Sequence, residues 1–405
     1  MLTFTGFLTE AKNLHLEHLE DEVLNNGVIG TREAINFLQS LRDMLAGNAK
    51  SSVNVTVKWD GAPAVFSGIN PENDQFFVGT KGVFNKNAKL NYTHEDIDRN
   101  HPNPGLNSKL KVALTELSKL GIKEVLQGDM LYTQDDLETK SIEGNQYVVF
   151  QPNTIVYAVP VKSAAPFLIS KMGIVFHTTY SGDTMEDMSA SFKVNLRGLV
   201  KTPNVWYADA SYKDTSGSIN FNKVETKAIT KVLSVAGKTF RTLDSNVLTK
   251  ITEDESIKIL IKTYNNTKVR TGEKITNTRM HTAGLIAYIY DKLKAEVNKV
   301  KRAETKAVKQ LVMDEKMKFF RSNSSQLVKI FDMQNLLVDA KEMVIRKLEK
   351  AKGLMDTFIR TETGYRVTQP EGFVAIDKVG RAVKLVDRLE FAHANFTAAK
   401  NWAGK

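Results

Sequence analysis

The sequence predicts an α+β protein in which a sheet domain is interrupted by a long helical segment. Short β-rich runs separated by Gly, Pro and Asn extend from VNVTVKW at residue 53 to GIVFHTTY at residue 173. From about 223 to 357 apolar residues recur at helical spacing, and β-rich runs return after Arg360. Because strand patterns flank the helices on both sides, we expect one sheet domain, split in sequence by an inserted helical bundle.

The individual elements follow from periodicity and from the residues that begin and end helices. These signals predict helices over 9–26, 31–46, 106–120, 277–322 and 325–356, with the last two broken near the sequence SNSS, and a polar loop over 134–146. At 405 residues the chain is long enough for two or three domains. We predict an N-terminal helical extension at 1–52, the first part of the sheet domain at 53–200, a basic and mostly helical insertion at 201–360, and the second part of the sheet domain with a terminal helix at 361–405.

Composition excludes several classes of protein. The sequence has no Cys, which rules out disulfides, cysteine nucleophiles and thiolate metal sites. No run approaches the ~20 apolar residues of a membrane span, and the N-terminus becomes acidic too early for a signal peptide. We therefore expect a cytoplasmic protein without a membrane partner.

The positive charge is concentrated in the predicted insertion. Residues 201–360 contain 31 Lys and Arg against 18 Asp and Glu, whereas the rest of the chain contains 25 against 28. A local basic surplus favours a polyanionic partner, because each neutralised phosphate releases condensed counterions. A lysine-rich helical surface that only contacts water is the alternative interpretation.

A lysine motif begins a series of ordered motifs. Lys58 ends a predicted strand and is followed by Asp60 and Gly61, which gives the pattern K-x-D-G. Alone this pattern is weak, since an exposed lysine before a β-turn matches it equally well. Further segments follow in order, namely FVGTKGVF at 77–84, LQGDMLYT at 126–133, TIVYAVPV at 154–161, PEGFVAI at 370–376 and AVKLVDR at 382–388.

In this order the motifs resemble those of the covalent nucleotidyltransferase superfamily, which comprises ATP-dependent DNA and RNA ligases and mRNA capping enzymes. The resemblance implies a ligase-type nucleotidyltransferase core, ATP and Mg²⁺, and a lysine that attacks the α-phosphate of the nucleotide. The chain also resembles proteins encoded by large tailed phages, which would place it in the host cytoplasm. The resemblance covers about 53–180 and 361–390.

The resemblance also implies a role for each matched residue. Lys58 is the nucleophile, Lys384 contacts the α-phosphate, and Glu371 coordinates the metal ion. Asp60 orients the lysine or holds a metal ligand in the outer shell. Lys81, where the family commonly has Arg, contacts phosphate or ribose; Asp129, in place of the usual Glu, binds the ribose; and Tyr157 stacks on the purine.

The departures from the family pattern narrow the expected activity. Only 17 residues follow Arg388, so we expect no C-terminal OB-fold, which argues against a DNA ligase or capping enzyme. We expect an RNA ligase-like enzyme that transfers AMP to a nucleic-acid 5′-phosphate and holds RNA or DNA ends through the basic insertion 201–360. The alternatives are a nucleic-acid-binding or assembly protein on an inactive scaffold, or nucleotide transfer to a protein or a small molecule.

Other candidate sites carry weaker signals. His15 and His18 are three residues apart on a predicted helix, but no further metal ligands lie near them in sequence. His177 lies in an apolar strand and is interpreted as a hydrogen-bonded core or pocket-lining residue. The sequence contains no phosphate-binding P-loop, dinucleotide fingerprint or nucleophile elbow, so competing enzyme classes lack support.

Overall fold

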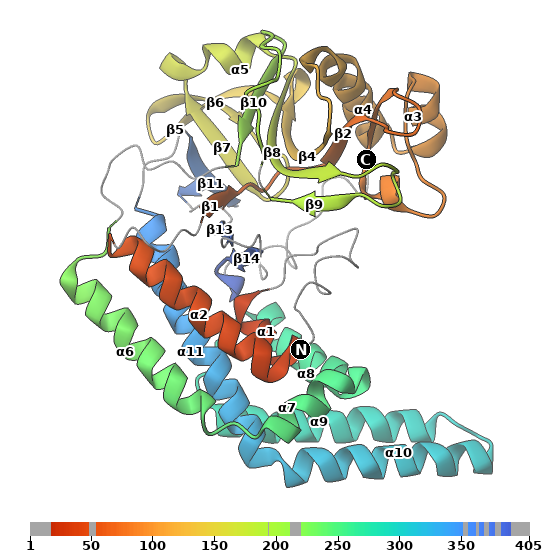
Figure 1. Cartoon of the computed structure of the whole chain (residues 1–405), viewed down its shortest axis with the longest axis vertical. Helices are drawn as coiled ribbons and strands as arrows, with labels where there is room; N and C mark the ends of the chain where they lie inside the picture. Colours follow the sequence, from red (N-terminus) through yellow and green to blue (C-terminus); the bar gives the residue numbers. More distant parts are fainter. Residues whose placement is uncertain are drawn as a thin grey trace.

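The computed structural model describes residues 18–47, 54–192, 194–210, 220–350, 355–361, 364–367, 372–376 and 382–389. The protein has an α+β fold, as the sequence predicts, with two larger sheets toward one end, a helical body at the other and a smaller sheet between them (Figure 1). Among the described residues, no helix combines the length and the apolar character needed to cross a membrane.

Two larger sheets form the upper part of the molecule. The six-stranded sheet has the order β10-β8-β4-β2-β3, with β9 added beside β8, and only β10 runs parallel to its neighbour. Its strands are β2 (Ala64–Ile69), β3 (Phe76–Gly79), β4 (Val125–Thr133), β8 (Met172–Ser181), β9 (Ser189–Ser191) and β10 (Val205–Asp209). The five-stranded sheet has the order β12-β11-β7-β6-β5, formed by β5 (Glu138–Ile142), β6 (Asn145–Phe150), β7 (Ile155–Pro160), β11 (Asp356–Thr361) and β12 (Gly364–Val367).

Short helices flank these sheets. Helix α4 covers one face of the six-stranded sheet and buries Leu110 and Leu117 against it. Its first turn is capped by the side chain of Asn103, which accepts a hydrogen bond from the Leu106 amide. The helices of this part are α3 (His94–Asn100), α4 (Pro104–Leu117) and α5 (Ala165–Ile169), with the short 3₁₀ turns η3 (Lys81–Phe84), η4 (Ser118–Leu120), η5 (Gln134–Asp136) and η6 (Val161–Ser163).

One core unites the N-terminal helices with the inserted helices. Helix α2 buries Leu38 and Leu41 in the same cluster as α6, α7 and α11, and each such side chain contributes about 1.5–3 kcal/mol when fully buried. The predicted N-terminal extension and the insertion therefore form a single helical body. Its members are η2 (Leu19–Asp21), α1 (Glu22–Asn25), α2 (Gly27–Leu45), α6 (Lys223–Phe240), α7 (Ser245–Glu253), α8 (Glu255–Thr271), α9 (Thr278–Asn298), α10 (Ala303–Ser322) and α11 (Ser324–Leu348).

The sheets extend past the boundaries predicted for the insertion. Strand β10 lies after residue 200 but pairs with β8, and β11 begins at Asp356 and pairs with β7. The prediction of a polar loop over 134–146 is wrong, because β5 and β6 form a hairpin there. Glu143 and Gly144 at its turn have φ angles of 51° and 80°, the left-handed pair that a tight hairpin requires. The predicted break near SNSS is confirmed at Asn323, between α10 and α11.

A third, three-stranded sheet lies between the two parts of the molecule (Figure 1). It has the order β1-β13-β14, formed by β1 (Asn54–Lys58), β13 (Gly372–Ile376) and β14 (Ala382–Leu385). One face, with Val57, Phe373 and Leu385, packs into the core of the helical body. The amide of Val57 donates to the carbonyl of Ala210 at 2.8 Å, which joins this sheet to the segment after β10.

A buried charged cluster joins the end of β14 to the helices. The Lys341 ammonium lies 2.7 and 2.9 Å from the two carboxylate oxygens of Glu20, and Arg388 donates to Asp21 at 2.9 Å. His18 adjoins this cluster and forms an isolated parallel bridge with Lys384. Burial, reinforced by Lys341, Arg388 and Lys384 and opposed by Glu20, lowers the pKa of His18 to about 3.

We predict that His18 makes the fold acid-sensitive. Its folded pKa is below the unfolded value, so the unfolded state binds the proton more tightly and stability falls as the pH drops below about 6.5. Between pH 7 and pH 5 this loss amounts to about 2 kcal/mol. Urea unfolding at the two pH values should show that His18→Leu removes this increment. The exposed His94 provides the control, since His94→Leu should retain it, and equal pH dependence of wild type and His18→Leu would contradict the prediction.

Candidate active site

The two lysines singled out by sequence lie on one face of the three-stranded sheet. Lys58 pairs with Gly372, while Thr56 pairs with Val374 and Val374 pairs with Lys384. Cross-strand partners share a face and alternate residues along a strand share a face, so Lys58 and Lys384 project to the same side. That side is opposite to the face that packs into the helical core. The fold thus brings together two lysines that the helical body separates in sequence.

The glycine after Glu371 has a conformation that other residues avoid. Gly372 has a φ of 141°, and a Cβ at this position would lie 2.5 Å from the carbonyl oxygen of Leu385. Glycine is therefore required at this position of the PEGFVAI segment, where β13 pairs with Lys58 of β1 on one side and lies against β14 on the other. Glu371 itself, the predicted metal ligand, lies outside the described residues.

Asp60 fixes the turn that follows Lys58. Its carboxylate accepts hydrogen bonds from the Asn153 side chain and the Thr154 amide, each at 2.7 Å, and from the Ile155 amide at 2.8 Å. The side chain is buried, so these donors replace the water that the charge loses. Because both oxygens already accept hydrogen bonds, the geometry favours a positioning role for Asp60 over the predicted role in metal binding.

Tyr157 is a core residue, which corrects its predicted role. Only 1% of the residue is exposed, its ring stacks on Phe150 at a centroid distance of 5.6 Å, and Trp59 lies 5.4 Å away. Its hydroxyl accepts a hydrogen bond from the Asp60 amide at 2.8 Å. A purine would find no open ring face here, so Tyr157 supports the turn after Lys58 instead of stacking on a base.

Asp129 lies against the same turn. Gln127 and Asp129 are the two residues of β4 that are only half-buried, and both occupy the sheet face turned away from α4. A Cβ at Gly61 would lie 2.5 Å from the Asp129 Cβ, so the glycine of K-x-D-G is what allows the turn to approach β4. Asp129 is thereby placed where a carboxylate can accept a hydrogen bond from a ligand hydroxyl near Lys58.

His177 is the partner that sequence reasoning did not assign to the site. Its Nε2 lies 3.7 Å from the Asp129 carboxylate, and its Nδ1 lies 2.8 Å from the Thr178 hydroxyl. In the register of β8 with β4, Phe176 opposes Gly128 and Thr178 opposes Gln127, so His177 is the extra residue of a β-bulge. Bulges of this kind redirect a side chain, and here the bulge brings the imidazole to the face of Asp129.

Backbone hydrogen bonds connect His177 to the lysine strand. The carbonyl of Phe176 accepts from the Ala210 amide at 3.0 Å, and the carbonyl of Ala210 accepts from Val57 at 2.8 Å. Lys58 directly follows Val57 in the chain, and His177 directly follows Phe176. The K-x-D-G turn, the polar positions of β4 and the bulge of β8 therefore meet in one region.

Lys81 lies farther along the same end of the six-stranded sheet. Gly79 of β3 pairs with Phe66 of β2, and Ala64 of β2 pairs with Asp129 of β4. Lys81 follows Gly79 by two residues and begins the turn η3, which leaves the end of β3. Lys81 is exposed and forms no ion pair within the described part of the chain, so its charge is available to an anion at this edge.

The donor set fits a nucleotide better than it fits a bare metal ion. Lys58, Lys384 and Lys81 can bind phosphate, and Asp129 and His177 can bind hydroxyl groups. Within the described residues, no group of three or more His, Asp or Glu side chains is placed to hold a metal ion. Mg²⁺ keeps most of its water and commonly binds through substrate phosphates together with one or two carboxylates. This set of residues is therefore compatible with Mg²⁺ that binds as a complex with the nucleotide.

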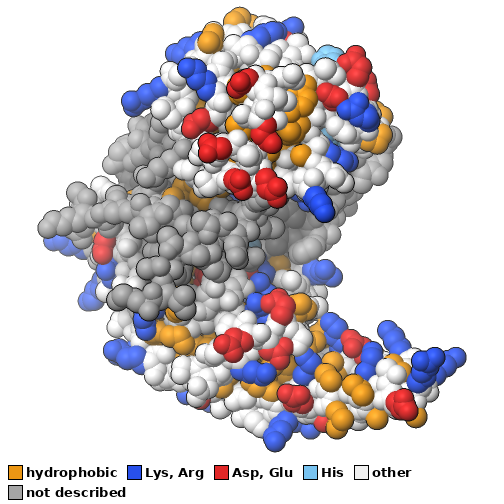
Figure 2. Space-filling view, turned by 45° about the vertical axis from the view of Figure 1, so that its right-hand side comes forward, with side chains coloured by type: hydrophobic (Ala, Val, Ile, Leu, Met, Phe, Trp, Pro, Cys, Tyr) orange, Lys and Arg blue, Asp and Glu red, His pale blue; other side chains and the backbone are white. Residues whose placement is uncertain are grey.

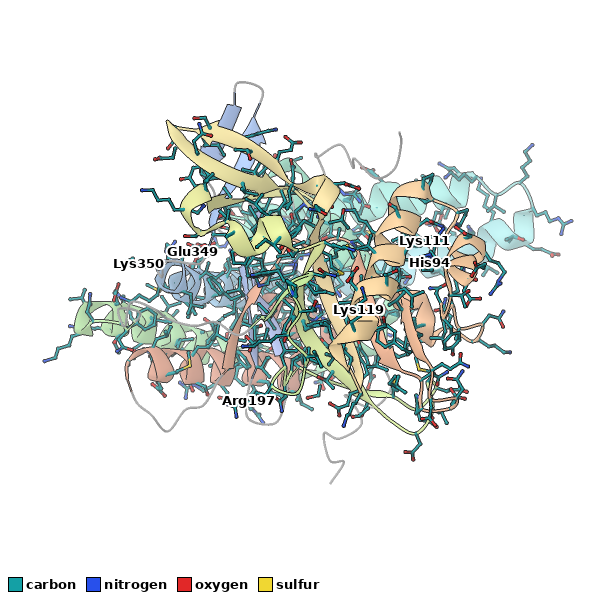
Figure 3. All side chains as sticks on the ribbon, turned by 90° about the horizontal axis from the view of Figure 1, so that it is seen from above. His94, Lys111, Lys119, Arg197, Glu349 and Lys350 are labelled. Carbon is teal, nitrogen blue, oxygen red and sulfur yellow. The ribbon has the colours of Figure 1, made fainter. Side chains whose placement is uncertain are left out.

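A separate cavity of about 800 Å³ lies beside β10, lined by residues that include Arg197, Lys201 and Tyr207. Arg197 is labelled in Figure 3. Tyr207 packs with the cluster under α4, on the sheet face opposite to Asp129. We therefore assign this cavity no part in holding a nucleotide at Lys58.

The fold and the site define an α+β protein with a two-lysine face next to an Asp129–His177 pair. A family model described as a family of unknown function (DUF6267) matches residues 13–400, and the chain belongs to that family. The comparison with curated proteins and the comparison with solved structures found no match.

Proposed function

We propose that this protein is a covalent nucleotidyltransferase in which Lys58 carries the nucleotide. The observation that carries the proposal is the strand register, which places Lys58 and Lys384 on one face of the three-stranded sheet. In the first step the unprotonated Lys58 amine attacks the α-phosphorus of ATP. A P–N bond forms, the bond to the bridging oxygen breaks, the amine loses a proton, and pyrophosphate leaves.

The neighbouring residues have defined roles in this step. Lys384 stabilises the negative charge that develops on the α-phosphate, and Lys81 holds the outer phosphates at the sheet edge. The Asp129 carboxylate accepts a hydrogen bond from one ribose hydroxyl, and the His177 imidazole donates a hydrogen bond to the other. These contacts hold the α-phosphate within reach of Lys58. Glu371 is the expected protein ligand of Mg²⁺, which would neutralise phosphate charge when bound.

The second step is AMP transfer to a nucleic-acid 5′-phosphate, followed by attack of a 3′-hydroxyl and release of AMP. The basic surplus of the helical segment supports a nucleic-acid acceptor over a small molecule. An RNA ligase-like enzyme is therefore our specific proposal. The inactive binding scaffold remains a second candidate, because the buried Tyr157 provides no open face for a base.

The test of the first step is covalent labelling of the protein. Protein treated with pyrophosphate to remove preformed adenylate is incubated with Mg²⁺ and α-radiolabelled ATP or GTP, denatured and separated on a gel. We expect label that survives alkali and is lost in acid, as a phosphoramidate requires. Absence of label with both nucleotides would favour the binding scaffold.

His177→Ala should slow this labelling by about 10- to 100-fold, because a hydrogen bond to the bound nucleotide is lost. Asp129→Asn should have an effect of similar size, and the double variant should lose less than the product of both, since the two side chains act on one group. His94, an exposed histidine on α3 (Figure 3), provides the matched control, and His94→Ala should label normally. Normal labelling by His177→Ala would remove this residue from the site.

A further inference from the structure

The end of the α9–α10 hairpin concentrates positive charge. Residues 290–309 contain seven Lys and Arg against three Asp and Glu. In Figure 2 the hairpin extends from the body as an arm, with Lys and Arg side chains at its tip. None of these seven cations forms an ion pair within the described part of the chain, and only Lys292 of them lies over an aromatic ring there, with its Nζ 5.8 Å from the centroid of the Tyr288 ring.

Several cations elsewhere in the helical body form ion pairs with neighbouring acidic residues. Lys268 pairs with Glu273 at 2.6 Å, and Lys347 pairs with Glu225 at 2.9 Å. At the hairpin tip, by contrast, Lys301 and Arg302 directly precede α10, where positive charge opposes the helix dipole. Their position costs helix stability and gains no internal partner, which favours a partner outside the chain.

The same hairpin exposes apolar and aromatic side chains. Tyr290 of α9 is 39% exposed, and Leu311 and Val308 of α10 are 70% and 60% exposed. The Tyr290 hydroxyl forms no hydrogen bond with the described residues. Single-stranded nucleic acid presents both charged phosphates and open base faces, whereas a duplex buries the base faces in its stack. Cations interspersed with an exposed aromatic ring therefore match a single strand better than a duplex.

We propose that the α9–α10 hairpin binds single-stranded nucleic acid through Lys299, Lys301, Arg302 and Lys306, with Tyr290 as a stacking surface. The proposal deepens the proposed function, since it names the surface that holds the acceptor strand. Binding at the hairpin nevertheless requires neither nucleotide nor Lys58, so each can fail without the other.

The test measures binding of a fluorescent single-stranded RNA oligonucleotide by anisotropy over a series of salt concentrations, without nucleotide. The tip variant replaces Lys299, Lys301, Arg302 and Lys306 with Gln. A matched control replaces Lys223, Lys227, Lys231 and Lys238 of α6 with Gln, because these are also exposed lysines without ion pairs in the described structure. We expect the tip variant to bind at least about tenfold more weakly and to lower the salt slope by about 3, while the control binds like wild type.

Three outcomes would overturn the proposal. Equal RNA binding by the tip variant and wild type would exclude the hairpin as the binding surface. Equal losses of affinity in the tip variant and the α6 variant would show that only overall charge matters. No binding of single strands or duplex by wild type would leave the arm as a surface for a protein partner. Tyr290→Ala should weaken single-strand binding and leave duplex binding unchanged, and an equal effect on both would exclude stacking. The tip variant should still be labelled normally at Lys58. Covalent labelling therefore tests the proposed active site independently of the proposed binding surface on the hairpin.

Discussion

Lys58→Ala should abolish covalent labelling by either nucleotide, because the side chain that forms the P–N bond is missing. Lys58→Arg should fail as well, since a guanidinium keeps the charge but stays protonated and cannot act as the nucleophile. Lys384→Ala should be labelled about 10²- to 10³-fold more slowly than wild type, because the substitution removes a cation that stabilises charge on the α-phosphate but leaves the nucleophile in place. The ordering of these three variants distinguishes a nucleophile from a phosphate contact.

The controls for this result lie within the same sheet domain. Lys123 is exposed and has no ion pair in the described structure, so Lys123→Ala should label like wild type. Lys58→Ala should keep its nucleic-acid affinity, because the proposed binding surface lies on the distant hairpin. Label retained by Lys58→Ala would show that another residue carries the nucleotide and would remove the proposed mechanism.

Local sequence patterns predicted most of the helices and strands, but they could not predict which strands pair over long distances in the sequence. The alternation in VNVTVKW predicts β1, but nothing in it indicates that Lys58 pairs with Gly372. Pairing between strands so far apart in sequence depends on the packing of Val57, Phe373 and Leu385 on the helical core. The convergence of Lys58 and Lys384 therefore came from the resemblance to ordered motifs, and periodicity alone would not have found it.

Burial, edge strands and a β-bulge explain where the structure differs from the sequence-based predictions or goes beyond them. The Tyr157 hydroxyl accepts a hydrogen bond from the Asp60 amide, and a motif match cannot show that both residues are buried. Strand β5 reads as a loop because Glu138 and Lys140 occupy an exposed edge strand, where apolar alternation is absent. His177 was placed correctly in a strand, but the bulge that turns it toward Asp129 has no sequence signature.

The helical body influences the site through the buried Glu20–Lys341 pair. Lys341 is 1% exposed, and Gln334 donates to the Glu20 backbone carbonyl at 3.1 Å, so α11 holds η2 by both side chain and backbone. The adjacent Asp21 binds Arg388, which follows the strand that carries Lys384. Disruption of this pair should therefore destabilise the fold and also disturb the position of β14.

Lys341→Met should lower the free energy of unfolding by about 3–5 kcal/mol, because it leaves the Glu20 carboxylate buried without its counter-ion. The double variant Glu20→Leu with Lys341→Met should recover most of this loss, since neither charge then remains buried. Urea unfolding measures all three proteins. Lys268→Met provides the control, because its ion pair with Glu273 is largely exposed and should contribute less than about 1 kcal/mol.

The pH dependence gives this prediction a second, independent readout. Although burial alone would raise the pKa of Glu20, the attraction and hydrogen bonds of Lys341 outweigh it and lower the pKa to about 2. In wild type, Glu20 therefore contributes stability above its unfolded pKa and loses it as the pH falls toward 2. In Lys341→Met the unpaired carboxyl has a raised pKa, so it destabilises the fold as the pH rises. The deficit of Lys341→Met should therefore shrink as the pH is lowered from 7 to about 4, and a deficit that stayed constant would show that lost packing, and not the buried charge, causes the instability.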